Sequence, residues 1–508
     1  MSLINRIAGL YYRPRLDKIE RMATHAELMQ ADQLRQLMAK AASTDFGRQH
    51  GLKPSTTYEE FARLVPVRDY NSYAPFVQRM LQGEKDVCWP GQTKWFAKSS
   101  GTTAAKSKYI PVTPEALRTC HYRGAQDVIA VYLRNHPDSH ILSGKCLTLG
   151  GSKKISTEGS RCQTGDLSAI MIGNSPWWAQ AFKTPRNSIA LIDKWEEKLV
   201  KLTQATVRED VTYLAGVPSW LLILLKHVMK TQGTTDIQSV WPNLELFIHG
   251  GINFEPYRSQ YQQIAPKGLN FMETYNASEG FFALQDDPAD KGMSLMLDYG
   301  IFYEFVPLDQ TDQEHPAGAV PLWGVRTDTD YAIVISTNGG LWRYMIGDTV
   351  RFTSANPYKI VISGRTKLYI NAFGEELMIG NAEAAMRKAC EATGALVKEY
   401  TAAPVFMEIG KHGCHQWLVE FEKRPADTTA FARTLDKALQ DVNSDYEAKR
   451  YKDITLDPLV LTEARPGLFF DWMKSIGKLG GQNKVPRLAN DRTVIDQLLK
   501  FNSQTTLQ

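Results

Sequence analysis

The sequence predicts an α/β protein with a large N-terminal α/β domain and a smaller C-terminal α+β domain. Three observations support this fold class. Strand and helix patterns alternate over residues 244–272, in the βαβ order that builds a parallel sheet. β-Branched and aromatic runs broken by turn signals follow over 281–363, and these are typical of antiparallel strands. Helix and strand patterns then continue over the length of a further domain, so the predicted domains are 1–363 and 364–508.

The N-terminal part of the chain is predicted to be mainly helical. The residues Tyr58-Glu59-Glu60-Phe61 follow Ser55-Thr56-Thr57, which is the pattern of a capped helix start. From about 120 to 235 helical patterns dominate. Within that stretch apolar residues recur at three- and four-residue steps, at Ile192, Trp195, Leu199 and Leu202. Such a stripe predicts a helix face that packs in the core.

The middle and C-terminal elements follow from shorter patterns. Residues 244–248 and 269–272 are predicted strands on either side of a helix at 256–264. Asn338-Gly339-Gly340 predicts a hairpin turn between strands at 333–335 and 342–344. The C-terminal domain is predicted to contain a helix at 380–392, strands near 396–408 and 414–422, a helix at 428–449 and a strand near 458–462.

Composition restricts the functional classes. The chain has 508 residues, 43% of them apolar, with a formal net charge of +4, and no basic run interleaved with aromatics indicates a nucleic-acid partner. The six cysteines show no CxxC spacing, which favours a reducing, cytoplasmic setting over a zinc site or a disulfide framework. The N-terminus lacks the apolar stretch of a signal peptide, and no apolar run has the roughly 20 residues needed to cross a membrane.

The strongest motif is the polar loop 99–108, which reads SSGTTAAKSK. Small residues let backbone N–H groups approach anionic oxygens, while hydroxyls and ammonium groups complete a phosphate cradle. It is not a nucleoside-triphosphatase P-loop, because Lys106 stands where that motif requires glycine. Taken alone, the loop is equally well explained as a solvated polar turn.

Two further segments carry carboxylates near predicted strands. Glu279 follows the strand at 269–272 and is suitable as a Mg²⁺ ligand, with the aromatic ring of Tyr275 nearby to stack on a base. Asp348 follows Gly347 at a strand edge, where a carboxylate can accept both hydroxyls of a ribose. In isolation Glu279 is better explained as a cap or surface acid, and Asp348 as part of a β-turn.

The order and spacing of these segments resemble the acyl-acid amido synthetases of the auxin-responsive type, a branch of the acyl-adenylate-forming superfamily. The loop 99–108 is similar to the family's SSGT[ST]xGxxK motif, 275–279 to its YxxSE motif and 344–348 to its YRxGD motif. The stretch 480–487 resembles its Q-x-K-x-P-R motif. Two departures are Ala105 in place of glycine and Met345 in place of arginine, which removes a possible ion pair.

The resemblance implies an enzyme that uses ATP and Mg²⁺ to adenylate a carboxylic acid and transfers the acyl group to an amino acid or other amine. It further implies a mobile C-terminal domain. The implied site residues are Ser99, Ser100, Thr102, Thr103 and Lys108 for the phosphates, Glu279 for Mg²⁺, Tyr275 for adenine, Asp348 for the ribose, Arg365 for the nucleotide at the domain junction, and Lys484 for the α-phosphate.

Three alternatives remain open at this stage. An acyl-CoA ligase shares the adenylation chemistry and differs only in the acceptor. A nucleotide-binding regulator could keep the fold without turnover, although the joint presence of Glu279, Asp348 and Lys484 argues against it. A kinase-like phosphotransferase is disfavoured because the loop does not match a P-loop. The acid, the amine, the acyl-pocket residues and the oligomeric state do not follow from the sequence.

Overall fold

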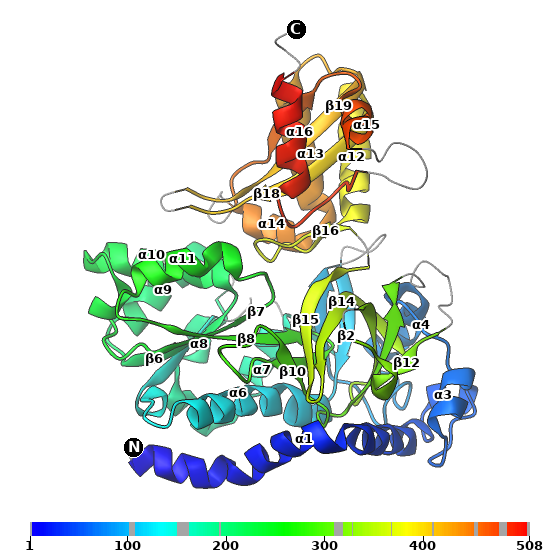
Figure 1. The fold of residues 1–508 in the computed structure, drawn as a ribbon, viewed down its shortest axis with the longest axis vertical. Coiled ribbons are helices and arrows are strands. Elements are labelled where there is room, and N and C mark those ends of the chain that lie inside the picture. Colours follow the sequence, from blue (N-terminus) through cyan, green and yellow to red (C-terminus); the bar gives the residue numbers. More distant parts are fainter. Residues whose placement is uncertain are drawn as a thin grey trace. The chain divides into compact units, whose positions relative to one another are not determined.

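In a computed structural model, the chain divides into two compact units (Figure 1). The larger unit comprises 1–99, 109–251 and 261–366, and the smaller comprises 100–108, 252–260 and 367–508. The structure describes residues 3–100, 107–149, 162–192, 195–308, 318–327, 329–366, 368–408, 411–451, 456–476 and 485–504.

One mixed sheet organises the larger unit, and the described residues contribute twelve strands to it. Its parallel half consists, in spatial order, of β5 (Lys183–Thr184), β3 (Lys145–Thr148), β6 (Val211–Gly216), β7 (Leu246–Gly250) and β8 (Asn270–Ala277). Its antiparallel half continues through β9 (Gly280–Leu284), β10 (Met293–Leu295), β15 (Tyr358–Arg365), β14 (Tyr344–Ala355), β13 (Asp330–Thr337), β11 (Ile301–Pro307) and β12 (Val320–Pro321). The predicted combination of parallel and antiparallel regions is thus confirmed, and the two join at β8 and β9.

The region 120–235 differs from the mainly helical prediction. It contains the helices α6 (Tyr122–Asn135), α9 (Trp195–Thr206) and α10 (Pro218–Gln232), but also three strands of the parallel half. Two of these strands, β3 and β5, span only four and two residues, which is too short for a periodic pattern to show. Pairing with the neighbouring strands of the sheet, rather than local sequence, determines their conformation.

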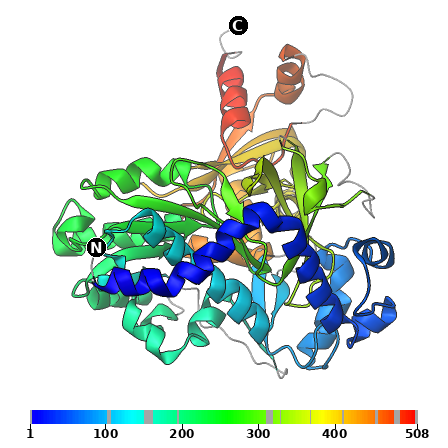
Figure 2. The ribbon, with the colours of Figure 1, turned by 60° about the horizontal axis from the view of Figure 1, so that its bottom comes forward.

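The long helix α1 (Leu3–Ala41) packs on α6 and β11 and crosses the larger unit (Figure 2). Its buried Gln30 donates from Nε2 to the carbonyl oxygens of Leu297 and Ile301, both at 3.0 Å. Arg15 donates to both oxygens of Asp127 on α6 and also contacts Asp298. Since Gln30 and Asp127 are buried, the helix is held by satisfied polar groups as well as by apolar packing.

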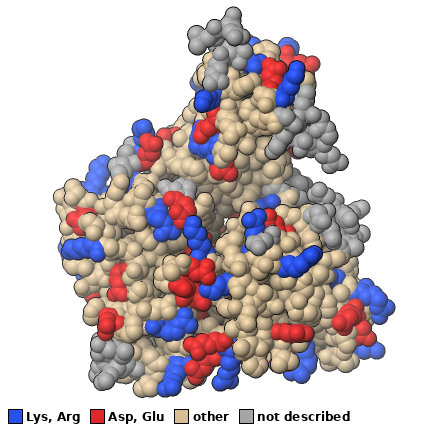
Figure 3. All heavy atoms as spheres, in the orientation of Figure 1, with Lys and Arg blue, Asp and Glu red and all other residues tan. Residues whose placement is uncertain are grey.

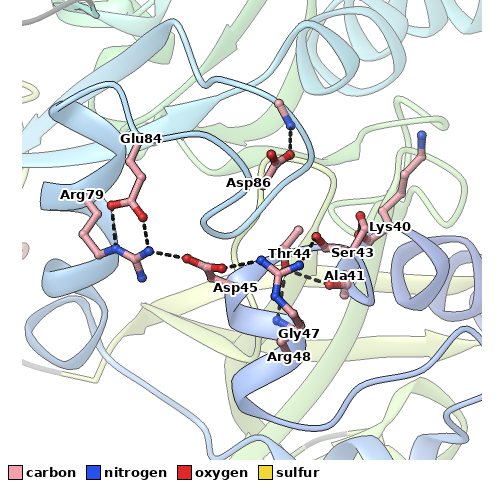
Figure 4. A network of polar contacts seen from close by, with 11 residues as sticks. Lys40, Ala41, Ser43, Thr44, Asp45, Gly47, Arg48, Arg79, Glu84 and Asp86 are labelled. Atoms are coloured by element: carbon pink, nitrogen blue, oxygen red, sulfur yellow. Dashed lines mark hydrogen bonds and ion pairs between the residues drawn. The ribbon is translucent and has the colours of Figure 1, made fainter.

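Three short helices follow α1, namely α2 (Asp45–Gln49), α3 (Tyr58–Leu64) and α4 (Tyr70–Leu81). Asp45 accepts hydrogen bonds from both Arg48 and Arg79, and Arg79 also donates to Glu84 (Figure 4). Such exposed ion pairs contribute little stability. Close packing is the stricter requirement, because a Cβ on Gly47 would lie 1.9 Å from the carbonyl oxygen of Ala41. The capped start predicted near Tyr58 is confirmed, and it takes the form of a capping box of Thr57 and Glu60 at the start of α3.

The smaller unit contains a three-stranded sheet of β18 (Leu396–Val405), β19 (Cys414–Lys423) and β20 (Val460–Ala464). Its helices are α12 (Ile379–Thr393), α13 (Thr428–Val442), α14 (Ser444–Arg450), α15 (Leu468–Ser475) and α16 (Thr493–Gln504). The single helix predicted at 428–449 is two helices, because Asn443 adopts an extended conformation and caps α14. The last two helices were not predicted.

Charges of both signs are interspersed on the face shown in Figure 3, consistent with the small net charge. Among the described residues, none of the helices has the length and apolarity to span a membrane. All six cysteines have free thiols in the structure.

Candidate active site

The candidate site lies where the parallel half of the large sheet meets the antiparallel half. Tyr275 belongs to β8, the last parallel strand, and Glu279 follows in the tight turn between β8 and β9. Ala277 pairs with Gly280 across this turn, so Ser278 and Glu279 form a two-residue hairpin connection. The segment similar to YxxSE therefore places a half-buried carboxylate beyond the carboxyl end of a parallel strand, a common position for ligand-binding residues in α/β proteins.

Asp348 is presented by a distorted part of β14. Gly347 before it has a φ of 101°, a conformation that side chains other than hydrogen rarely allow. Thr366 donates its backbone N–H to the carbonyl oxygen of Gly347 at 2.8 Å and so secures this distortion. Asp348 is opposite Arg365 on the neighbouring strand β15, and the register shifts one pair further on, between Thr349 and Val350. Glycine is thus required before the aspartate for a structural reason.

Two of the predicted residues converge on the carboxylate of a third, Asp348. The Tyr275 hydroxyl donates to Oδ2 of Asp348 at 2.8 Å, and Nε of Arg365 donates to Oδ1 at 2.7 Å. Tyr275 and Asp348 are only 4% and 8% exposed to solvent. Burial, and next the charge of Asp348, raise the pKa of Tyr275 well above its ordinary value, so its hydroxyl remains a hydrogen-bond donor. A carboxylate has about four acceptor sites, and two of those on Asp348 are used here.

The ring of Tyr275 packs on Phe282, with ring centroids 4.8 Å apart. Because the residue is almost completely buried, its hydroxyl is the group that takes part in the site in this structure. Stacking of the ring on adenine remains a prediction.

The phosphate-loop residues are described only in part. Ser99 and Ser100 end β1 (Trp95–Ser100), and Lys108 lies in β2 (Ser107–Val112), where it is 9% exposed. Strands β1 and β2 are neighbours in a small sheet that also contains β4 (Gln163–Gly165). The loop thus connects two adjacent strands. Thr102, Thr103 and Lys484 lie outside the described residues.

Glu279 is the predicted metal ligand within this arrangement. Its charge acts on both Tyr275 and Tyr344 and contributes to the raised pKa of each, after the larger effect of burial. Across the ranges that the structure describes, there is no group of three or more His, Cys, Asp or Glu side chains that could hold a metal ion. A single carboxylate suits Mg²⁺, which typically binds one or two protein carboxylates and completes its shell with phosphate oxygens and water.

An ion pair that the sequence analysis missed supports the start of β14. Arg343 donates from Nε and Nη2 to the two oxygens of Glu304, at 2.9 and 2.8 Å, and from Nη1 to the carbonyl oxygens of Ala62 and Val65. The chain has Met345 where the family motif has arginine, but Arg343, two residues earlier, makes a buried ion pair. Its position directly before Tyr344 was the only sequence signal. Arg343 also has a φ of 44°, which sequence patterns do not reveal.

Comparisons with known proteins match most of the chain to one family. The models for the GH3 family N-terminal, central and C-terminal domains match residues 15–270, 294–365 and 380–493. Indole-3-acetic acid-amido synthetase GH3.8 of Oryza sativa subsp. indica is 24% identical, over 94% of this chain and 91% of the relative. Jasmonoyl--L-amino acid synthetase GH3.5 of Oryza sativa subsp. japonica is 24% identical, over 96% of each chain.

Two solved structures share the fold. GH3.15 acyl acid amido synthetase superposes with a TM-score of 0.60 at 17% identity, covering 97% of this chain and 95% of that one. A 2-hydroxyisobutyryl-CoA ligase in complex with an acyl-adenylate and CoA superposes with a TM-score of 0.56 at 14% identity, covering 94% and 92%.

Proposed function

The chain belongs to the GH3 family, and from this membership we propose that it is an ATP- and Mg²⁺-dependent acyl-acid amido synthetase. It would activate a small carboxylic acid as the acyl-adenylate and transfer the acyl group to an amino acid or another amine. The family expected from the four motifs is confirmed. The relatives named as amido synthetases support the proposed activity.

One observation carries the site assignment. Tyr275 and Asp348 come from two separate motifs, 73 residues apart in sequence, and meet in a hydrogen bond of 2.8 Å. Arg365 joins the same carboxylate from the adjacent strand. This convergence of residues from separate motifs supports one shared site over independent turns, and the position beyond β8 would suit a nucleotide.

In the first half-reaction an oxygen of the substrate carboxylate attacks the α-phosphorus of ATP. The bond from that phosphorus to the bridging oxygen breaks, and pyrophosphate leaves with the electron pair. Charge on the phosphate oxygens must be met by fixed donors. Asp348 would accept the ribose hydroxyls and orient the nucleotide. The serines, threonines and lysine of 99–108 would bind phosphate oxygens, and Lys484 would neutralise the α-phosphate.

In the second half-reaction the amine nitrogen attacks the acyl carbon, the bond to the phosphate oxygen breaks, and AMP leaves. The nitrogen loses a proton to complete the amide. In the first half-reaction, Glu279 would hold Mg²⁺, which would supply positive charge to stabilise the phosphate oxygens of ATP. The single carboxylate at the β8–β9 turn fits an ion that arrives with its nucleotide.

The acceptor is the feature that separates this proposal from its nearest alternative, an acyl-CoA ligase. We expect formation of an amide when the acid, ATP and Mg²⁺ are supplied with a panel of amino acids, and no thioester when CoA replaces them. Mass spectrometry of the products distinguishes the two. Formation of a CoA thioester without an amide would assign the chain to the acyl-CoA ligases.

A further inference from the structure

We propose that Tyr275 is a positioning residue for the ribose: its hydroxyl orients the Asp348 carboxylate, which then selects ribonucleotides over 2′-deoxyribonucleotides. This inference rests on the proposed nucleotide site. It assigns Tyr275 a role through its hydroxyl group, distinct from stacking of its ring on adenine.

The hydrogen-bond geometry supports this role. Asp348 has one oxygen fixed by Arg365 at 2.7 Å and the other by Tyr275 at 2.8 Å. Two donors on opposite oxygens define the plane of the carboxylate, whereas one donor leaves rotation about the terminal bond. Gly347 and Thr366 fix the backbone of Asp348 but do not determine this rotation. Among the described residues, Tyr275 is therefore a second group, beside Arg365, that orients the carboxylate.

Burial separates the role of the hydroxyl from that of the ring. Tyr275 is 4% exposed, and its ring packs on Phe282. The ring thus offers little surface to a base, while the hydroxyl directly contacts the group proposed to bind the ribose. Tyr275 remains protonated in this setting because burial raises its pKa well above the ordinary value, so the donor is present throughout the usual assay range.

The orientation of Asp348 has a consequence for substrate choice. A carboxylate whose plane is fixed can accept one ribose hydroxyl on each oxygen, and loss of the 2′-hydroxyl leaves one acceptor site without its donor. Such a loss lowers affinity by roughly 10-fold or more. A carboxylate that rotates can instead relax toward the remaining hydroxyl. The ratio of affinities for ATP and 2′-deoxy-ATP thus reports how firmly Asp348 is oriented.

The test compares Tyr275→Phe with the unchanged protein. Phenylalanine keeps the ring and removes only the hydroxyl, so a stacking role predicts no change. We expect the Kd for ATP, measured by calorimetry, to rise about 10-fold, because a hydrogen bond to a charged group is lost. The preference for ATP over 2′-deoxy-ATP should fall toward one. In pyrophosphate exchange, the KM for ATP should rise while kcat changes by less than about two-fold, since the contact is made in both ground and transition states.

Tyr303→Phe is the matched control. Tyr303 is fully buried in the sheet, and its hydroxyl donates to the backbone oxygen of Met296 rather than to a residue of the candidate site. The Tyr303→Phe substitution should leave the affinities for ATP and for 2′-deoxy-ATP unchanged. In an Asp348→Ala background, Tyr275→Phe should have almost no further effect, because a residue that acts through Asp348 cannot act when it is absent.

The outcomes distinguish the possibilities. Unchanged nucleotide affinities in a folded Tyr275→Phe variant would overturn the proposal. Additive effects of Asp348→Ala and Tyr275→Phe on the affinity for ATP would overturn it as well. If the protein binds ATP but shows no pyrophosphate exchange with any acid tested, the proposed enzyme activity is refuted. The comparison of ATP with 2′-deoxy-ATP would still decide the role of Tyr275. Absence of ATP binding would overturn both.

Discussion

Replacing Lys484 by alanine is expected to lower the rate of ATP–pyrophosphate exchange at least about 10²-fold, the scale seen when one preorganised charge-stabilising donor is removed. In the proposed mechanism, the C-terminal domain brings the ammonium group of Lys484 to the α-phosphate of ATP as the substrate carboxylate attacks. Charge shifts there during the attack, so the contact is stronger in the transition state than with bound ATP. Affinity for ATP and for the acid should therefore stay nearly normal.

A comparison of the half-reactions makes this prediction specific. When the acyl-adenylate is supplied ready-made, transfer to the amine should be affected far less than exchange in Lys484→Ala. Lys474→Ala removes an exposed lysine of α15 in the same domain and should change neither step. The segment just beyond Lys484 is structurally secured, because Pro486 accepts from Thr401 and Arg487 accepts from the backbone of Ala402. Equal loss in both half-reactions would mean that Lys484 has another role, and unchanged exchange would remove it from the site.

Replacing Arg343 by methionine is expected to lower the free energy of unfolding by about 3–5 kcal/mol, since it leaves the charge of Glu304 buried without its partner. The side chains of Arg343 and Glu304 are 7% and 1% exposed. Burial raises the pKa of Glu304, with Arg343 acting in the opposite direction. In the variant Glu304 should take up a proton more readily. Its folded-state pKa then lies further above the unfolded value, so the loss of stability should shrink as pH is lowered.

The same strand supplies a control for this experiment. Arg351 pairs with Asp330 across β14 and β13, but its side chain is 47% exposed. Arg351→Met should cost less than about 1 kcal/mol. Denaturant unfolding of both variants over a range of pH measures the difference. Similar small losses in the two variants would show that the buried pair does not secure the start of β14, the strand that carries Asp348.

The sequence was informative where local chemistry decides the conformation. The hydroxyl residues before Tyr58 indicated a capped helix start. Asn338-Gly339-Gly340 indicated the hairpin, in which Ile335 lies opposite Tyr344, although the second strand begins at Tyr344 rather than at Trp342 as predicted. Motif residues could also be recognised individually, because their types and order suit nucleotide chemistry. Each of these signals lies within a few residues of chain.

Contacts between strands that are distant in sequence could not be predicted from such local signals. The hydrogen bond from Tyr275 to Asp348 depends on β8, β9, β10, β15 and β14 being neighbours in that order, and no local pattern specifies it. The partner of Arg343, Glu304, comes from β11 on the far side of β13. Strands β3 and β5 were likewise missed, since their conformation derives from pairing within the sheet.

Adenylation is the central claim, and ATP–pyrophosphate exchange tests it most directly because the exchange requires a reversible acyl-adenylate step. The wild-type protein would be incubated with ATP, Mg²⁺, labelled pyrophosphate and, one at a time, aryl, indolyl and fatty acids. We expect label to enter ATP with at least one acid, and only when that acid and Mg²⁺ are both present. Binding of ATP without acid-dependent exchange across the whole panel would contradict the account and favour a nucleotide-binding regulator.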